Sequence, residues 1–219
     1  MSERWATFDC YGTLIDWNLG IRTVLARVFG EADAGARLRQ YHEIEPRLEH
    51  SGRLTYRQVL TDAMGEMQAP ARAMTALAES LPSWPPFPEV PAALRTLRER
   101  GWRLAILSNT DRDYIEASIA RIGVPFDLAI VGSEIQSYKP ARRHWDTFFA
   151  RTGADRTRHV HVAASLFHDI EPAAALQMRA VWINRLGEGS VLPRAGEMPD
   201  LAQLPDTLDA LVAPRVTDR

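Results

Sequence analysis

The sequence predicts an α/β protein whose parallel sheet is interrupted, after its first strand, by a helical insertion. Short apolar runs alternate with helical patterns from residue 89 onward, as is typical of a parallel sheet covered by helices on both faces. Between the first apolar run and residue 89, only helical patterns occur. Five prolines within Leu81–Pro91 then end this helical stretch, because proline cannot continue a helix.

The predicted strands are short apolar runs that end in small or polar residues. The first, Trp5–Phe8, ends at Asp9 and a Gly12-Thr13 turn. Right-handed crossovers bring the carboxyl ends of parallel strands to one edge of a sheet, where such folds bind ligands. The other four runs are Trp102–Ser108, Leu128–Ser133, His159–Ser165 and Ala180–Asn184.

The predicted helices fall into two groups. In the C-terminal group, Glu89–Gly101 has apolar residues at helical spacing and a glycine that stops it. The rest of this group comprises Asp111–Ile122, Arg142–Thr152, Asp169–Met178 and Leu204–Val212. The inserted group comprises Asn18–Phe29, Ala36–His50, Leu54–Met67 and Ala71–Leu81. We therefore expect a core of residues 1–15 and 87–219 and an α-helical cap of residues 16–86.

Composition narrows the class of protein. The 219 residues are 46% hydrophobic and 25% charged, as in ordinary globular proteins, and the formal net charge of −2 predicts no nucleic-acid partner. The first residues lack the apolar run of a signal peptide, and no segment has the roughly 20 apolar residues that span a bilayer. With its single cysteine, Cys10, the chain is expected to be cytoplasmic, with no membrane partner.

Polar residues follow four of the predicted strands. Asp9 ends the first, Ser108 and Asn109 end the second, Lys139 lies shortly after the third, and Asp169 lies just past the fourth. Each alone has an ordinary alternative: a carboxylate or serine can cap a turn or helix, and a lysine can be solvated. Together they suit covalent catalysis by a carboxylate, with an ammonium group to hold an anion and a second carboxylate to handle water.

The order of these motifs resembles the haloacid dehalogenase superfamily. Asp9-x-Tyr11-Gly-Thr-Leu is the most specific motif, and Ser108-Asn109, Lys139-Pro140 and the late Asp169 add weight by order and spacing. The resemblance covers nearly the whole chain. It implies a Rossmann-like core with an α-helical cap inserted after the first strand.

Tyr11 points to one branch of that superfamily. Its magnesium-dependent phosphatases usually carry Asp where this chain has Tyr11, and a metal-binding acidic residue where it has Ala164. A methyl group cannot ligate a hard cation, so we expect no metal and no cofactor. Tyr11 resembles the L-2-haloacid dehalogenase branch. There, the leaving halide needs no proton and the nucleophile needs no metal.

That branch implies a role for each candidate residue. Asp9 attacks the halogen-bearing carbon to form an ester, Lys139 reduces the charge repulsion, and Asp169 activates the water. Tyr11 (through nearby backbone N–H groups), Ser108 and Asn109 bind a small carboxylate-bearing substrate. The family's halide-accepting arginine lies early in the cap. This part of the chain offers Arg37 and Arg39, and Arg39 is the residue expected to take that role here.

Two alternatives remain open at this point. One is a phosphatase with a reduced magnesium site, in which Glu134 or Glu171 would help to bind the ion. The other is a protein without catalytic activity that binds a small anion or a partner. The resemblance is also compatible with a homodimer.

Overall fold

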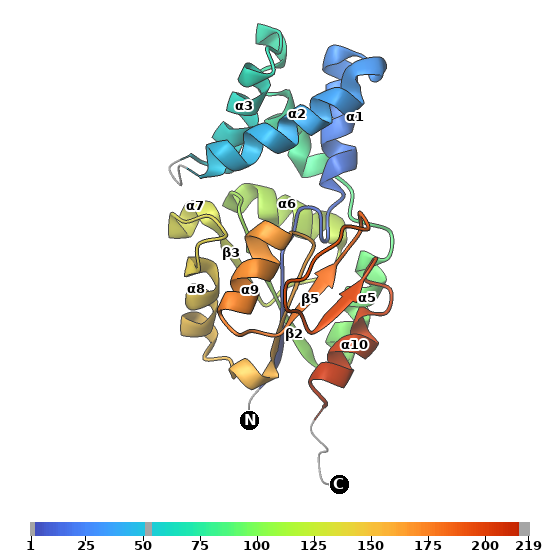
Figure 1. The fold of residues 1–219 in the computed structure, drawn as a ribbon, viewed down its shortest axis with the longest axis vertical. Helices are drawn as coiled ribbons and strands as arrows, with labels where there is room; N and C mark the ends of the chain where they lie inside the picture. Colours follow the sequence, from blue (N-terminus) through green and yellow to red (C-terminus); the bar gives the residue numbers. More distant parts are fainter. Residues whose placement is uncertain (1–2, 51–53, 215–219) are drawn as a thin grey trace.

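The computed structural model describes residues 3–50 and 54–214, and its centre is a six-stranded parallel sheet (Figure 1). The strand order is β3-β2-β1-β4-β5-β6, so the chain crosses to the other side of β1 when it passes from β3 to β4. The predicted α/β fold with a Rossmann-like sheet is confirmed. The strands are β1 (Arg4–Phe8), β2 (Trp102–Ser108), β3 (Leu128–Val131), β4 (His159–Ala163), β5 (Ala180–Ile183) and β6 (Gly196–Met198).

The edge strand β6 was not predicted. It has three residues, none fully buried, and it pairs only with β5. Such a short strand lacks the apolar run that marks the others, and its place in the sheet depends on backbone pairing alone.

Two sets of helices cover the two faces of the sheet. On the face that carries Ala6 and Phe8 lie α5 (Val90–Glu99), α6 (Arg112–Ile122) and α10 (Leu204–Leu211). On the face that carries Trp5 lie α7 (Gly132–Ile135), α8 (Arg143–Thr152) and α9 (Glu171–Ala175). Since successive side chains of a strand point to opposite faces, both faces of β1 are buried.

The remaining helices form a separate layer over the carboxyl edge of the sheet (Figure 1). We call this the helical layer; it contains α1 (Trp17–Phe29), α2 (Glu31–Glu49), α3 (Tyr56–Glu66) and α4 (Ala76–Ser80). Asp16 caps α1 by accepting a hydrogen bond from the backbone N–H of Leu19. No described helix is long and apolar enough to cross a membrane.

The single helix predicted over Ala71–Leu81 is wrong. Two 3₁₀ turns, Ala71–Ala73 and Leu81–Ser83, flank the short helix α4. Thr75 leaves the helical conformation before α4, with φ −94° and ψ 1°. The periodicity of apolar residues continues through these breaks, and therefore it does not reveal them.

The two connections between the helical layer and the sheet run side by side. The backbone N–H of Asp16 donates to Pro85 O at 2.9 Å, and that of Phe87 donates to Leu14 O at 3.0 Å. Ile15 and Pro86 form an isolated β-bridge between the same segments. The layer thus leaves and rejoins the sheet at one point.

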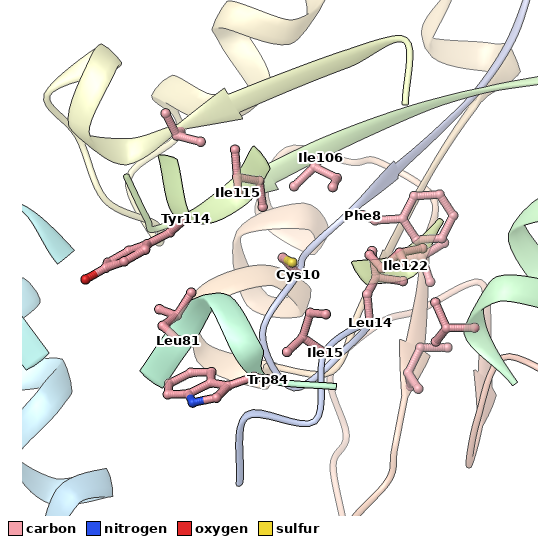
Figure 2. Packing of buried hydrophobic residues seen from close by; sticks show 14 of the residues in the cluster. Phe8, Cys10, Leu14, Ile15, Leu81, Trp84, Ile106, Tyr114, Ile115 and Ile122 are labelled. Atoms are coloured by element: carbon pink, nitrogen blue, oxygen red, sulfur yellow. The ribbon is translucent and has the colours of Figure 1, made fainter. Parts of the chain in front are cut away.

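Apolar packing holds the loop that follows β1 (Figure 2). Cys10, Leu14 and Ile15 on this loop are fully buried. They belong to one continuous cluster with Phe8 of β1, Tyr114 and Ile115 of α6, and Leu81 and Trp84 of the return segment. Full burial of a large apolar side chain contributes about 1.5–3 kcal/mol. The loop is therefore fixed by the core, which makes it a rigid support for the residues at the end of β1.

We predict that Gly20→Ala destabilises the protein, although alanine is the better helix former. A Cβ at Gly20 would clash with the buried indole ring of Trp84, and overpacking of this kind costs about 1–3 kcal/mol. Gly35→Ala in α2 is the matched control, because its Cβ would meet only Arg39, at 3.9 Å. Urea unfolding followed by circular dichroism should show a lower free energy of unfolding for Gly20→Ala and no decrease for Gly35→Ala. Equal stability of the two variants would contradict this account of the packing.

Candidate active site

The polar residues predicted at the strand ends meet in one cavity of about 380 Å³. Asp9 follows β1, Ser108 and Asn109 end β2, and Lys139 and Asp169 come from the loops after β3 and β4. All five line the cavity. It lies at the ends of β1 and its neighbours, where the strand order reverses and where folds of this kind bind ligands.

The ammonium group of Lys139 bridges two carboxylates. Lys139 Nζ lies 2.8 Å from Asp9 Oδ1 and 2.7 Å from Asp169 Oδ1, and the lysine is only 2% exposed. Burial alone would lower the pKa of Lys139, but Asp169 and Asp9 together raise it above its ordinary value. Burial would likewise raise the pKa of Asp169, and Lys139 and His161 bring it below its usual range instead. Both groups of the Lys139–Asp169 pair are therefore charged at neutral pH.

Thr13 fixes the other oxygen of Asp9. Its hydroxyl donates to Asp9 Oδ2 at 2.7 Å and accepts from the backbone N–H of Ala164 at 2.9 Å. This pair of bonds ties the loop after β1 to the end of β4. The sequence places Thr13 in the motif that begins at Asp9, but only the fold shows that its hydroxyl contacts Asp9.

A buried chain of hydrogen bonds extends from Asp169 into the sheet. His161 Nε2 donates to Asp169 Oδ1 at 3.0 Å, because a charged carboxylate can only accept. The hydroxyl of Thr7 lies 2.9 Å from His161 Nδ1 and 2.8 Å from His159 Nε2. Burial and the nearby His161 lower the pKa of His159 to about 3, so this ring is neutral.

Asp169 itself lies in a single π-helical turn, Leu166–Ile170. The prediction that a regular helix runs from Asp169 to Met178 is therefore wrong at its first turn. Ser165 caps the π-helical turn, since its hydroxyl accepts from the backbone N–H of His168. Asp169 Oδ2 is buried and has no hydrogen-bond donor among the described residues. This oxygen therefore retains an unused capacity to accept a hydrogen bond.

Asn109 and Tyr11 reach the cavity with their polar groups already engaged. The side chain of Asn109 accepts from Lys139 N at 2.6 Å and donates to Lys139 O at 3.0 Å, so it fixes the backbone at Lys139. The hydroxyl of Tyr11 lies 3.1 Å from Ser118 Oγ, on α6, and its ring stacks on Tyr56. The ring of Tyr11, rather than its hydroxyl, forms part of the wall.

Arg39 does not reach the cavity. It is exposed on α2 and is absent from the residues that line the cavity. At 1.5 Å of rise per residue, it lies about 9 Å earlier along the helix axis than Glu45, which does line the cavity. The expectation that Arg39 accepts the halide is therefore not supported by its position.

The face of α2 that lines the cavity carries two buried glutamates instead. Glu45 and Glu49 are 6% and 4% exposed. The hydroxyl of Tyr56 donates to Glu45 Oε1 at 3.1 Å, and Asn109 Nδ2 donates to Glu49 Oε2 at 3.0 Å. Burial raises the pKa of Glu45 to about 7, and burial together with Glu45 raises the pKa of Glu49. Sequence reasoning missed both residues, although their spacing of four places them on one helix face with His42.

No group of three or more His, Cys, Asp or Glu side chains in the described ranges is arranged to hold a metal ion. Asp9 and Asp169 share the lysine ammonium, and Ala164, at the end of β4, contributes a methyl group.

We predict that Glu45 makes the folded protein less stable as the pH rises from about 4.5 to about 7. The folded state retains a proton on Glu45 that the unfolded chain has lost, which amounts to up to roughly 3 kcal/mol across this window. Glu45→Gln, which cannot ionise, should reduce this loss, as measured by urea unfolding at about pH 5 and about pH 8. Glu43→Gln, on the exposed face of the same helix, is the control. Its free energy of unfolding should change with pH as that of the wild-type protein does. If the free energy of unfolding of Glu45→Gln changed with pH as in the wild-type protein, Glu45 would already be ionised in the folded state at about pH 5.

Comparison with known proteins connects this site to a family. Residues 4–177 match the sequence model of a protein family that is described as haloacid dehalogenase-like hydrolase. The chain is 30% identical over 209 residues to an (S)-2-haloacid dehalogenase of Pseudomonas sp. (strain YL), covering 88% of this chain and 87% of the relative. It is 34% identical over 129 residues to haloacetate dehalogenase H-2 of Moraxella sp. (strain B), covering 58% of this chain and 55% of the relative.

Solved structures with the same fold have lower sequence identity. The L-2-haloacid dehalogenase RSc1362 superposes with a TM-score of 0.84 at 23% identity, covering 95% of this chain and 100% of that chain. The structure of L-2-haloacid dehalogenase from Xanthobacter autotrophicus with chloropropionic acid covalently bound superposes with a TM-score of 0.80 at 18% identity. The match covers 97% of this chain and 100% of that chain. Because the family model matches most of the chain, the chain belongs to the haloacid dehalogenase-like hydrolases.

Proposed function

We propose that this protein hydrolyses small 2-haloacids through an ester on Asp9. The observation that carries the proposal is the bridge from Lys139 Nζ to Asp9 Oδ1 and Asp169 Oδ1, at 2.8 and 2.7 Å. It holds one carboxylate ready to attack and a second beside it, in a cavity of a size suited to a small substrate. The similarity to (S)-2-haloacid dehalogenases supports the choice of reaction.

In the first step, an oxygen of Asp9 attacks C2 of the substrate from the side opposite the halogen. The carbon–halogen bond breaks, its electron pair leaves with the halide, and an ester between Asp9 and C2 forms with inversion. Lys139 offsets the repulsion between the Asp9 carboxylate and the incoming anion. No proton is needed by the halide, which is consistent with an aromatic ring at Tyr11 in place of an acid.

In the second step, water attacks the carbonyl carbon of the ester. Asp169 takes a proton from that water through Oδ2, the oxygen free of protein donors, and then releases it to solvent. Lys139 Nζ stabilises the negative charge that develops on the Asp9 oxygen. Collapse of the intermediate breaks the bond between the Asp9 carbonyl carbon and the ester oxygen. The leaving oxygen takes the proton of the hydroxyl group that the water added, which frees the 2-hydroxyacid and restores Asp9 as a carboxylate.

The other polar residues have supporting roles in this proposal. Ser108 and the backbone N–H groups near Tyr11 bind the substrate carboxylate, whereas Asn109 positions Lys139. Residues 16–86 serve as a cap over a core of residues 1–15 and 87–219, which agrees with the paired connections at Asp16 and Phe87.

We also propose the cellular location and the partners of the enzyme from its composition. A cytoplasmic enzyme without a nucleic-acid partner fits the single cysteine and the net charge of −2. The homodimer stays a prediction.

We predict that Asp9→Asn lowers chloride release from (S)-2-chloropropionate by at least about a thousandfold, because an amide is a poor nucleophile. Asp62→Asn, on the exposed side of α3, is the matched control and should retain full activity. Chloride release and its insensitivity to EDTA would be measured together with hydrolysis of p-nitrophenyl phosphate. Phosphate release that disappears with EDTA, without chloride release, would favour the phosphatase alternative.

We also predict that a single turnover in ¹⁸O-water places the label in the peptide that contains Asp9. Water attacks the ester at the Asp9 carbonyl carbon, so the first product molecule carries an unlabelled oxygen from the enzyme. Mass spectrometry of the digested protein measures the ¹⁸O content of the Asp9 peptide, and mass spectrometry of the product measures the ¹⁸O content of its hydroxyl group. Label in the product and none at Asp9 would mean that water attacks the substrate directly.

A further inference from the structure

The two buried glutamates of α2 have no role in the reaction described above. Among the residues that the structure describes, five acidic side chains line the cavity, those of Asp9, Glu45, Glu49, Asp169 and Glu188, and Lys139 is the one residue with an ammonium group. The cavity also contains two histidines, His42 and His168, but burial lowers the pKa of both, so neither adds positive charge at neutral pH. The described part of the wall is thus rich in acidic groups, although the proposed substrate is an anion, and the raised pKa values of Glu45 and Glu49 show that both lack a counter-charge.

Glu45 and Glu49 form a pair that can receive a ligand. They lie one helical turn apart, a spacing that puts neighbouring side chains about 5–6 Å apart at Cβ. Each has one oxygen held by the protein: Tyr56 donates to Glu45 Oε1, and Asn109 donates to Glu49 Oε2, which also lies 3.5 Å from His168 Nε2. No donor within the described part of the chain contacts Glu45 Oε2 or Glu49 Oε1. Two carboxylate oxygens can therefore accept hydrogen bonds from one group in the cavity.

The electrostatics of this pair favour a cationic ligand. Buried carboxylates without a counter-charge are costly, and Asp9 adds repulsion to both glutamates. Lys139 does not relieve this cost in full, since Asp9 and Asp169 already share its ammonium group. An ammonium group between Glu45 and Glu49 would provide the missing charge and would make charge-assisted hydrogen bonds to both.

We propose that the substrate is a zwitterionic 2-haloacid, whose carboxylate faces the sheet edge and whose ammonium group is bound by Glu45 and Glu49. This proposal rests on the proposed function and narrows its substrate class. A cavity of about 380 Å³ suits a short compound such as 3-amino-2-chloropropanoate. Glu45 and Glu49 would thereby select against haloacids with a purely apolar side chain.

The first test compares two substrates of the same shape. (S)-3-Amino-2-chloropropanoate and (S)-2-chlorobutanoate differ only by an ammonium group in place of a methyl group. We expect the wild-type enzyme to show a kcat/KM for chloride release at least tenfold higher for the amino compound. In the Glu45→Gln/Glu49→Gln variant this preference should fall at least tenfold, mainly through loss of activity on the amino compound. Glu43→Gln should keep the wild-type preference.

A second test does not depend on turnover. Calorimetry on the wild-type protein compares binding of the two products, (R)-3-amino-2-hydroxypropanoate and (R)-2-hydroxybutanoate. We expect the amino compound to bind at least tenfold more tightly, and single Glu45→Gln or Glu49→Gln variants to reduce that difference. The single variants serve if the double variant fails to fold.

The outcomes separate the two proposals. Preferential binding of the amino product without chloride release from either substrate would support the acidic subsite and overturn the proposed dehalogenation. Chloride release from 2-chlorobutanoate at an equal or higher kcat/KM, with no binding preference, would overturn the subsite and leave dehalogenation standing. A preference for the amino compounds that survives both Glu→Gln changes would also overturn the assignment to Glu45 and Glu49.

Discussion

The site depends on one interaction, the ammonium group of Lys139 held between the carboxylates of Asp9 and Asp169. Burying an ion costs several kcal/mol even after relaxation, so two buried carboxylates need a counter-charge in close contact. Lys139 provides it from a third loop, and the surrounding bonds fix all three groups. Thr13 holds Asp9, His161 holds Asp169, and Asn109 fixes the backbone of Lys139. A small displacement of any one loop would leave a buried charge unpaired, which explains why the loop after β1 packs so deeply into the core.

The sheet edge and the helical layer divide the work of the site. The segments after β1, β3 and β4 hold Asp9, Lys139 and Asp169, because parallel strands place all their carboxyl ends at the same edge of the sheet. Helix α2 forms the opposite wall of the cavity, where Glu45 and Glu49 line it. In the reaction that we propose, the sheet edge supplies the chemistry and the helical layer selects the substrate.

This division is consistent with the comparisons. The fold superposes on L-2-haloacid dehalogenases along almost the whole chain, with sequence identity below 25% for the two structures described. A shared fold fixes the positions of strand ends, but the residues that face the substrate can change without disturbing it. The acidic face of α2 is a feature that fold similarity alone does not determine.

By itself the sequence determined the α/β class, five of the six strands and the meeting of Asp9, Lys139 and Asp169 at one edge. These follow from local apolar runs and from the geometry of parallel sheets, both of which can be read along the chain. The sequence could not determine β6, which depends on pairing with β5, nor the breaks on either side of α4. It also could not show which face of α2 meets the cavity, so that Arg39 was expected there and Glu45 was not. That choice depends on how the helical layer packs against the sheet, and only the tertiary structure decides it, because helix periodicity is the same whichever face is turned inward.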